Sequence, residues 1–265
     1  MHPQKSLLKR LHSPQATLIN LTAKTMSSRF YPQRRALGHG RIDPGAAPVK
    51  PRNAATMIIW RKGRDGIEVL MGRRSRRAAF IPDYFVFPGG RIDPADRTVR
   101  PATPLDPAAA KRMAVRRDPG LAETLAIAAV RETFEETGLL LAESGGIGSV
   151  AHPEWAQWKA RGLAPGLHRL VYFGRAITSS ISPIRFHARF FVASADALRG
   201  EIAGSGELSE LGFYLVAKVL AHMPVVDVTE FMLNRVNAYT AVPEHFDNRS
   251  PVFFYRNEVP YVRYE

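Results

Sequence analysis

Residues 123–139 read ETLAIAAVRETFEETGL, and this stretch decides the fold. Apolar residues recur every three or four positions, which predicts an amphipathic helix over 121–137. Asp118 followed by Pro119 is typical of an N-cap and a first helical turn. Gly138 suits the position after the last turn, where φ is often positive. We therefore expect one continuous helix with defined ends.

Three glutamates share one face of this helix. At roughly 100° per residue, Glu135 lies roughly 60° to one side of Glu132 and Glu136 roughly 40° to the other. The opposite face is apolar and is expected to enter the core through Ile127, Val130 and Phe134. Like charges at these spacings repel by a few tenths of a kcal/mol per pair, which a bound cation would relieve. Oxygen ligands without a nearby His or Cys favour Mg²⁺ or Mn²⁺, although a solvated acidic helix face is the alternative.

The helix is part of a longer motif. Its fixed positions are Glu123, Arg131-Glu132, Glu135-Glu136, Gly138 and Leu139. This order and spacing resemble the Nudix box, G-x5-E-x7-R-E-U-x-E-E-x-G-U, in which U is a bulky apolar residue. Thr133 departs from the pattern at the first U position. The chain is thus similar to the Nudix hydrolase superfamily.

The glycine that opens the box is not at its usual spacing before Glu123, since Arg117 occupies that position. Phe87-Pro88-Gly89-Gly90 resembles the F-P-G-G sequence of many members. If Gly90 is the box glycine, 32 residues separate it from Glu123 instead of five. The resemblance therefore implies an α+β fold, the Nudix α/β/α sandwich with a mixed β-sheet, and an insertion at about 91–119.

The resemblance also implies a metal site. Its ligands would be Glu132, Glu135, Glu136 and the backbone carbonyl of Gly89, and the ion would be Mg²⁺ or Mn²⁺. Catalytic roles would fall on Glu132, Glu135 and Arg131. Arg131 would hold a helix carboxylate in place, and Glu123 is the acid of the box with which it could pair.

The reaction implied is the attack of water on one phosphorus of a phosphoanhydride. The general base varies across the family. Glu132 and Glu135 are candidates within the box. Glu207 and Glu210 resemble a later acidic position used by some members, and ordinary loop acids are the alternative for that pair.

The rest of the chain from about 54 to 253 resembles the branch that contains the peroxisomal acyl-coenzyme A diphosphatases. The segments that carry this likeness are 69–75, 84–93, 177–178 and 185–191. A separate coenzyme A signature is not met, since Asp83 and Ala79 stand where it has Gly and Arg. The substrate expected is coenzyme A or acyl-coenzyme A, bound with help from Arg73, Arg74, Gly90 and Arg185. A nucleotide sugar, a dinucleotide or a nucleoside triphosphate is the alternative.

Charge is unevenly distributed over the 265 residues, whose formal net charge is +13. Residues 1–52 are basic, rich in Gly and Pro towards their end, and predicted to be a disordered tail before a domain at 53–265. The tail keeps a third hypothesis open, a non-catalytic nucleic-acid-binding or regulatory module. That class has no need of clustered carboxylates, so the expected partner is a small phosphoanhydride and not nucleic acid. The sequence leaves open whether the protein forms a homodimer.

The chain has no cysteine and no apolar run near the roughly 20 residues of a membrane span. We expect a cytoplasmic bacterial protein, and organellar targeting by the basic tail stays open. Strands are expected at 57–60, 67–71, 84–87, 139–141, 170–173, 186–192 and 211–215, with a hairpin turn at 64–66. Further helices are expected at 153–162, 216–222 and 228–239.

Overall fold

A computed structural model of the chain describes residues 29–30, 42, 45–113, 118–241 and 249–265. Most of the predicted tail therefore lies outside the described residues, and its disorder stays a prediction. Within it, Arg29–Phe30 form strand β1, which pairs with the last strand of the chain. In the described part, no helix has the length and apolar character needed to cross a bilayer.

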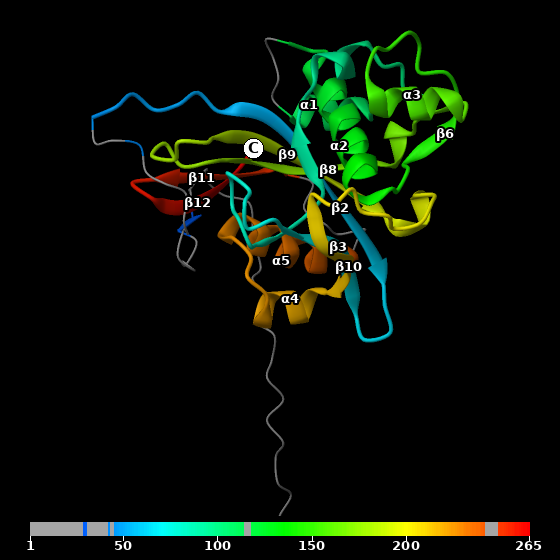
Figure 1. Ribbon diagram of the computed structural model, residues 1–265. Helices are drawn as coiled ribbons and strands as arrows, with labels where there is room; N and C mark the ends of the chain where they lie inside the picture. Colours follow the sequence, from blue (N-terminus) through cyan, green and yellow to red (C-terminus); the bar gives the residue numbers. More distant parts are fainter. Residues whose placement is uncertain (1–28, 31–41, 43–44, 114–117, 242–248) are drawn as a thin grey trace, which may run out of the picture.

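In the described part of the chain, the centre of the molecule is a mixed sheet of ten strands (Figure 1). Eight of them follow the order β1-β12-β11-β8-β9-β2-β3-β10, while β4 pairs with β3 and β5 pairs with β2. The strands are β2 (Arg52–Lys62), β3 (Ile67–Arg74), β4 (Phe85–Val86), β5 (Gly89–Arg91), β8 (Val171–Ile177), β9 (Phe186–Ser194), β10 (Leu208–Leu215), β11 (Pro251–Arg256) and β12 (Val259–Tyr264). The pairs β2–β9 and β8–β11 are parallel and the others antiparallel. β11 and β12 are present in addition to the expected strands.

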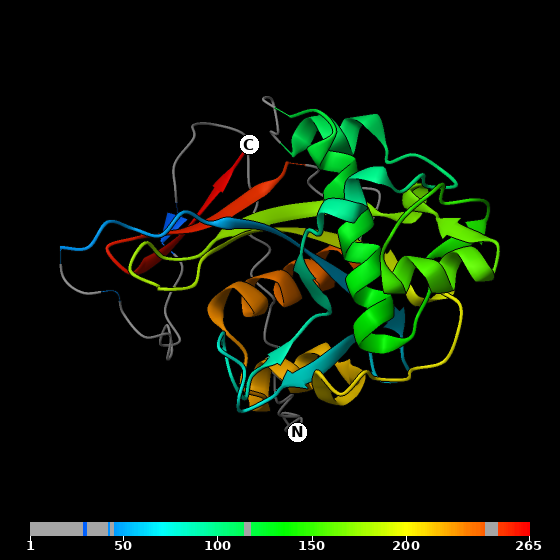
Figure 2. The same ribbon diagram turned by 45° about the horizontal axis from the view of Figure 1, so that its top comes forward.

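Helices cover both faces of the sheet, as Figures 1 and 2 show. On one face lie α1 (Pro107–Arg112), α2 (Leu121–Thr137) and α3 (Pro153–Ala160); on the other lie α4 (Val216–His222) and α5 (Asp227–Ala241). Successive residues of β2 alternate between the two cores: Met57 and Ile59 pack under α2, and Ile58 packs with α5. The predicted α/β/α sandwich with a mixed sheet is confirmed.

The predicted insertion contains short helical elements. A 3₁₀ helix, η1 (Pro94–Thr98), follows the glycine pair, and α1 precedes the main helix, while residues 114–117 lie outside the described part. The strand expected at 139–141 is wrong in position. Leu140 forms only an isolated bridge with Arg199, and β6 (Ala142–Ser144) follows, paired with β7 (Leu163–Pro165). Two further 3₁₀ turns are η2 (Leu167–Arg169) and η3 (Ala195–Ala197).

Two neighbours of the central strand β2 bring the glycine pair against it. The predicted hairpin joins β2 to β3, where the Gly63 N–H donates to the Gly66 carbonyl at 2.8 Å. β5 then lies along β2 with Gly89 opposite Thr56. Gly89 has φ +153°, and a Cβ there would lie 2.4 Å from the Ala55 carbonyl oxygen. Only glycine lets the backbone come this close.

The substitution Gly89→Ala is expected to lower the free energy of unfolding by about 2–4 kcal/mol, because it combines backbone strain with a steric clash. Urea unfolding followed by circular dichroism measures this. Gly146→Ala is the matched control, since a Cβ there meets no atom within 4 Å. Equal stabilities of the two variants would contradict the tight β2–β5 contact.

Candidate active site

Helix α2 spans Leu121–Thr137, as predicted, but its first turn differs from expectation. The N-cap is Gly120, without a side-chain cap, so the prediction of Asp118 as N-cap is wrong. Asp118 instead pairs with Arg97 at 2.7 Å, and its backbone carbonyl accepts the Leu121 N–H at 3.1 Å. At the other end Gly138 has φ +76° and its N–H donates to the Phe134 carbonyl at 2.8 Å, which confirms its role as the terminating residue.

The glycine pair packs directly on the carboxylate face of α2. Glu136 is 3% exposed and accepts the Gly89 N–H at 2.8 Å. A Cβ on Gly90 would lie 2.4 Å from the Glu132 carboxyl carbon, so the second glycine leaves space for that side chain. The opposite face of the helix is buried in the core, as predicted. The structure therefore brings Gly89, Gly90, Glu132 and Glu136 together.

Arg131 connects the helix to the insertion. Its guanidinium donates to both carboxylate oxygens of the fully buried Asp96, at 2.9 and 3.2 Å, and to the Arg91 carbonyl at 2.9 Å. It also pairs with Glu132 at 2.9 Å and Glu135 at 3.1 Å. Its principal partner is thus Asp96, and the expected pairing with Glu123 is not among the contacts of Arg131 with described residues.

Asp96 was not predicted as part of the site, although the sequence carries a local signal for its position. Asp93 caps η1, and the Asp96 carboxylate accepts a hydrogen bond from the Asp93 N–H at 2.8 Å, which is the capping-box arrangement. The Trp155 indole N–H also donates to Asp96 at 3.2 Å. The capped η1 of the insertion and Trp155 of α3 therefore fix Asp96, which holds Arg131 in one orientation.

The site carries more buried negative charge than its cations balance. Burial, with a smaller contribution from the nearby Glu132, raises the pKa of Glu136 to about 8 against the opposing effect of the Gly89 N–H. Burial also raises the pKa of Glu132 to about 7, against the opposing effect of Arg131. Burial works against the Arg131 cation, but its hydrogen bond with Asp96 and the adjacent carboxylates raise its pKa overall.

A hard divalent cation fits this donor chemistry, because it would offset the cost of burying two carboxylates in their charged form. Among the described residues, however, no three His, Cys, Asp or Glu side chains are already grouped as a metal centre. Glu132 and Glu135 are directed at Arg131, and Glu136 at the Gly89 N–H. Each of these contacts uses one carboxylate oxygen, so binding an ion here requires the side chains to bring their second oxygens to a common point.

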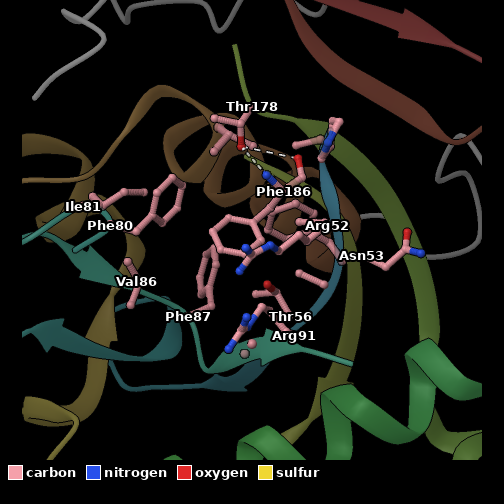
Figure 3. Close-up of a pocket in the computed structure, with 18 of the residues that line it drawn as sticks. Arg52, Asn53, Thr56, Phe80, Ile81, Val86, Phe87, Arg91, Thr178 and Phe186 are labelled. Carbon is pink, nitrogen blue, oxygen red and sulfur yellow. Dashed lines mark hydrogen bonds between the residues drawn. The ribbon is translucent and has the colours of Figure 1, made fainter. Parts of the chain in front are cut away.

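The carboxylate face forms one side of a cleft with a volume of about 1200 Å³. Its lining includes Glu132, Glu135, Glu136, Gly89, Gly90, Arg74 and Glu207. Further out the lining combines polar and charged side chains with aromatic ones, and Figure 3 shows Phe80, Phe87 and Phe186 gathered on one side. The Phe80 and Phe186 rings meet edge to face, 4.8 Å between centroids. This aromatic wall was not expected from the sequence.

The other predicted residues lie outside the cleft lining. Arg73 pairs with Asp83 at 2.9 Å and with Glu210 at 3.0 Å, on the outer side of β3. Arg185 donates to the backbone carbonyls of Thr178 and Val49. The structure thus brings Arg74 and Glu207 to the carboxylates and does not bring Arg73, Arg185 or Glu210 there.

The comparisons with known proteins agree with this geometry. The NUDIX domain family model matches residues 50–222, so the chain belongs to the Nudix family. It is 33% identical over 109 residues to a Caenorhabditis elegans protein named "Putative nudix hydrolase 7". That match covers 41% of this chain and only 29% of the length of the relative.

A solved structure gives a similar result over a longer range. The crystal structure of a NUDIX hydrolase from Alicyclobacillus acidocaldarius has a TM-score of 0.55 and is 29% identical in sequence. The match covers 71% of this chain and 92% of that one. The superfamily and the fold predicted from the box are therefore confirmed.

Removing the buried partner of Arg131 is expected to be costly. Asp96→Asn should lower the free energy of unfolding by about 3–5 kcal/mol, because it removes the fully buried counter-charge of a buried guanidinium and leaves only the more exposed Glu132 and Glu135. Asp118→Asn is the matched control: it breaks an Asp–Arg pair whose side chains are 40% and 46% exposed, and should leave the free energy of unfolding nearly unchanged, because water screens such a pair. Similar denaturation midpoints for the two variants would contradict the role of Asp96.

The raised pKa values predict how stability depends on pH without metal. Glu136 and Glu132 bind protons more tightly when folded, with pKa values of about 8 and about 7 against an ordinary 4.5. Their stabilising effect is complete below pH 4.5 and is lost as pH rises to about 8. In EDTA, the unfolding free energy should therefore fall over this range, and less steeply in Glu136→Gln. A slope unchanged by this substitution, measured beside Glu123→Gln, would refute the assignment.

Proposed function

We propose that this protein hydrolyses a phosphoanhydride bond in a nucleoside-diphosphate-linked substrate with the help of a divalent metal ion. The observation that carries the proposal is the carboxylate face of α2, packed against the glycine pair at the side of a deep cleft. In the reaction, water forms a new P–O bond and the bridging P–O bond breaks, so two phosphate products leave.

Glu132 and Glu136, with Glu135 and the Gly89 carbonyl, are the residues that would hold Mg²⁺ or Mn²⁺. When bound, such an ion neutralises charge on phosphate oxygens and makes water a stronger nucleophile. The protein's own residues position the carboxylates. Arg131 keeps Glu132 and Glu135 in place, and Asp96 keeps Arg131 in place.

For the general base, the geometry favours Glu207 over Glu210. Glu207 lines the cleft, and its charge acts on Glu136. Glu210 is exposed and paired with Arg73. Glu132 and Glu135 remain candidates, but both are already engaged by Arg131. In this proposal Glu207 takes the proton of the attacking water.

Coenzyme A or acyl-coenzyme A is the proposed substrate. Support comes from the likeness of several segments to the acyl-coenzyme A diphosphatases and from the size of the cleft, whose lining includes Phe80 and Phe186 in addition to the carboxylates. A nucleotide sugar, a dinucleotide or a nucleoside triphosphate is the competing substrate class. A non-catalytic binding module is disfavoured because it has no need of the clustered carboxylates of α2, which repel phosphate unless a metal ion is bound.

A substrate panel tests the proposal. Coenzyme A, acyl-coenzyme A, NADH, ADP-ribose and nucleoside triphosphates are assayed with Mg²⁺ and with Mn²⁺. We expect coenzyme A compounds to give the highest kcat/KM, and Glu136→Gln to lower turnover at least about a hundredfold while the fold remains intact. Glu123→Gln is the control and should stay active. Full activity of Glu136→Gln, or activity without metal, would overturn the proposal.

Substitutions of two glutamates three residues apart test which of them is the general base. Glu207→Gln should lower kcat by about 10²–10⁴, as expected for loss of a general base, with little change in KM. Glu210→Gln should leave kcat within about twofold, because its partner Arg73 lies outside the cleft. Steady-state kinetics across a pH range measure both. The reverse ranking would assign the base to Glu210.

A further inference from the structure

Two cations lie side by side on the rim of the cleft, at the start of the central strand. Lys50 and Arg52 both line it and both side chains are exposed. Neither forms a hydrogen bond or an ion pair through its side chain with any residue that the structure describes. In Figure 3 the Arg52 side chain extends from β2 towards Phe186 and Phe87. These charges are therefore available to an anion.

The backbone that carries them is held firmly. The Arg52 N–H donates to the Arg185 carbonyl at 2.9 Å, and the Arg185 guanidinium donates to the Val49 carbonyl at 2.7 Å. Arg185 thus forms hydrogen bonds with the backbone on both sides of Lys50. A residue expected to bind substrate directly instead positions the two cations that line the cleft.

The cations are separate from the metal-binding carboxylates. Arg52 and Thr56 lie on the same face of β2, four residues apart, which is about 13 Å of strand. Thr56 is opposite Gly89, at the carboxylate end. An anion bound by Lys50 and Arg52 is therefore not the diphosphate at Glu132 and Glu136, but a second anionic group further along the same cleft.

We propose that Lys50 and Arg52 form a second anion subsite, which binds a phosphomonoester on the nucleoside half of the substrate. The adjacent rings of Phe80 and Phe186 give an aromatic surface for the base of the same nucleoside. Arg52 provides a planar fork for phosphate oxygens, and Lys50 adds a point charge. This subsite rests on the proposed function for the reaction it serves, but its ligand preference can be measured without turnover.

The test compares two nucleotides that differ by one phosphomonoester, 3′,5′-ADP and AMP. Isothermal titration calorimetry in EDTA gives the Kd of each for the full chain. The wild type should bind 3′,5′-ADP about tenfold more tightly than AMP, as expected for one added charge-assisted contact. Raising the salt concentration should narrow this ratio, because the site is exposed.

Variants assign the preference to particular residues. Arg52→Gln should reduce the ratio to within about twofold, Lys50→Gln should reduce it in part, and Arg52→Lys should restore some of it. Arg64→Gln is the matched control: it removes an exposed arginine of the β2–β3 turn, outside the cleft lining, and should keep the full ratio. Circular dichroism checks that each variant is folded.

Three results would overturn the subsite: equal binding of both nucleotides by the wild type, an unchanged ratio in Arg52→Gln, or no binding of either. The proposed function is judged separately, from turnover of coenzyme A and 3′-dephospho-coenzyme A. If neither is hydrolysed while the Arg52-dependent ratio persists, the subsite stands and the coenzyme A proposal falls. If both are hydrolysed with equal kcat/KM and Arg52→Gln has no effect, the coenzyme A proposal stands and the subsite falls.

Discussion

The contact between the Glu136 carboxylate and the Gly89 N–H joins the two halves of the site. Glu136 is almost fully buried on α2, and Gly89 lies on β5 against the central strand β2. Because Gly89 fits only without a side chain, the glycine pair and the helix face can approach closely enough to share one small volume. The cleft wall, the carboxylate cluster and the route of the chain into the insertion all follow from this approach.

Arg131 makes that arrangement electrostatically tolerable. A single guanidinium contacts Asp96, Glu132 and Glu135. Glu136 accepts the Gly89 N–H, and its pKa is raised to about 8 although the charge of Arg74 opposes the shift. One cation cannot balance this group of buried acids, and the remaining charge is what a divalent ion would neutralise. Lys50 and Arg52, which have no acidic partner in the described part, lie further along the same cleft, where an anionic substrate would extend.

The sequence predicted what depends on local spacing. Helix α2, its end at Gly138, its buried face and the sandwich fold follow from a periodic motif within one element. What depends on distant pairing was missed: Asp96 meets Arg131 from 35 residues away. Asp118, expected as the N-cap, pairs with Arg97, and the N-cap is Gly120. Arg73 and Arg185 matched a basic pattern, but partners contributed by other segments, Glu210 and Val49, draw them away from the cleft.

The most direct test of the account is to locate the ion itself. Crystals of the wild-type protein are soaked in Mn²⁺, and an anomalous difference map at the manganese edge shows where it binds. The account predicts a peak within coordination distance of Glu132 and Glu136, about 2.2 Å, next to the Gly89 carbonyl, and its loss in Glu136→Gln. A peak remote from these carboxylates, or a fully occupied site that persists in the variant, would contradict it.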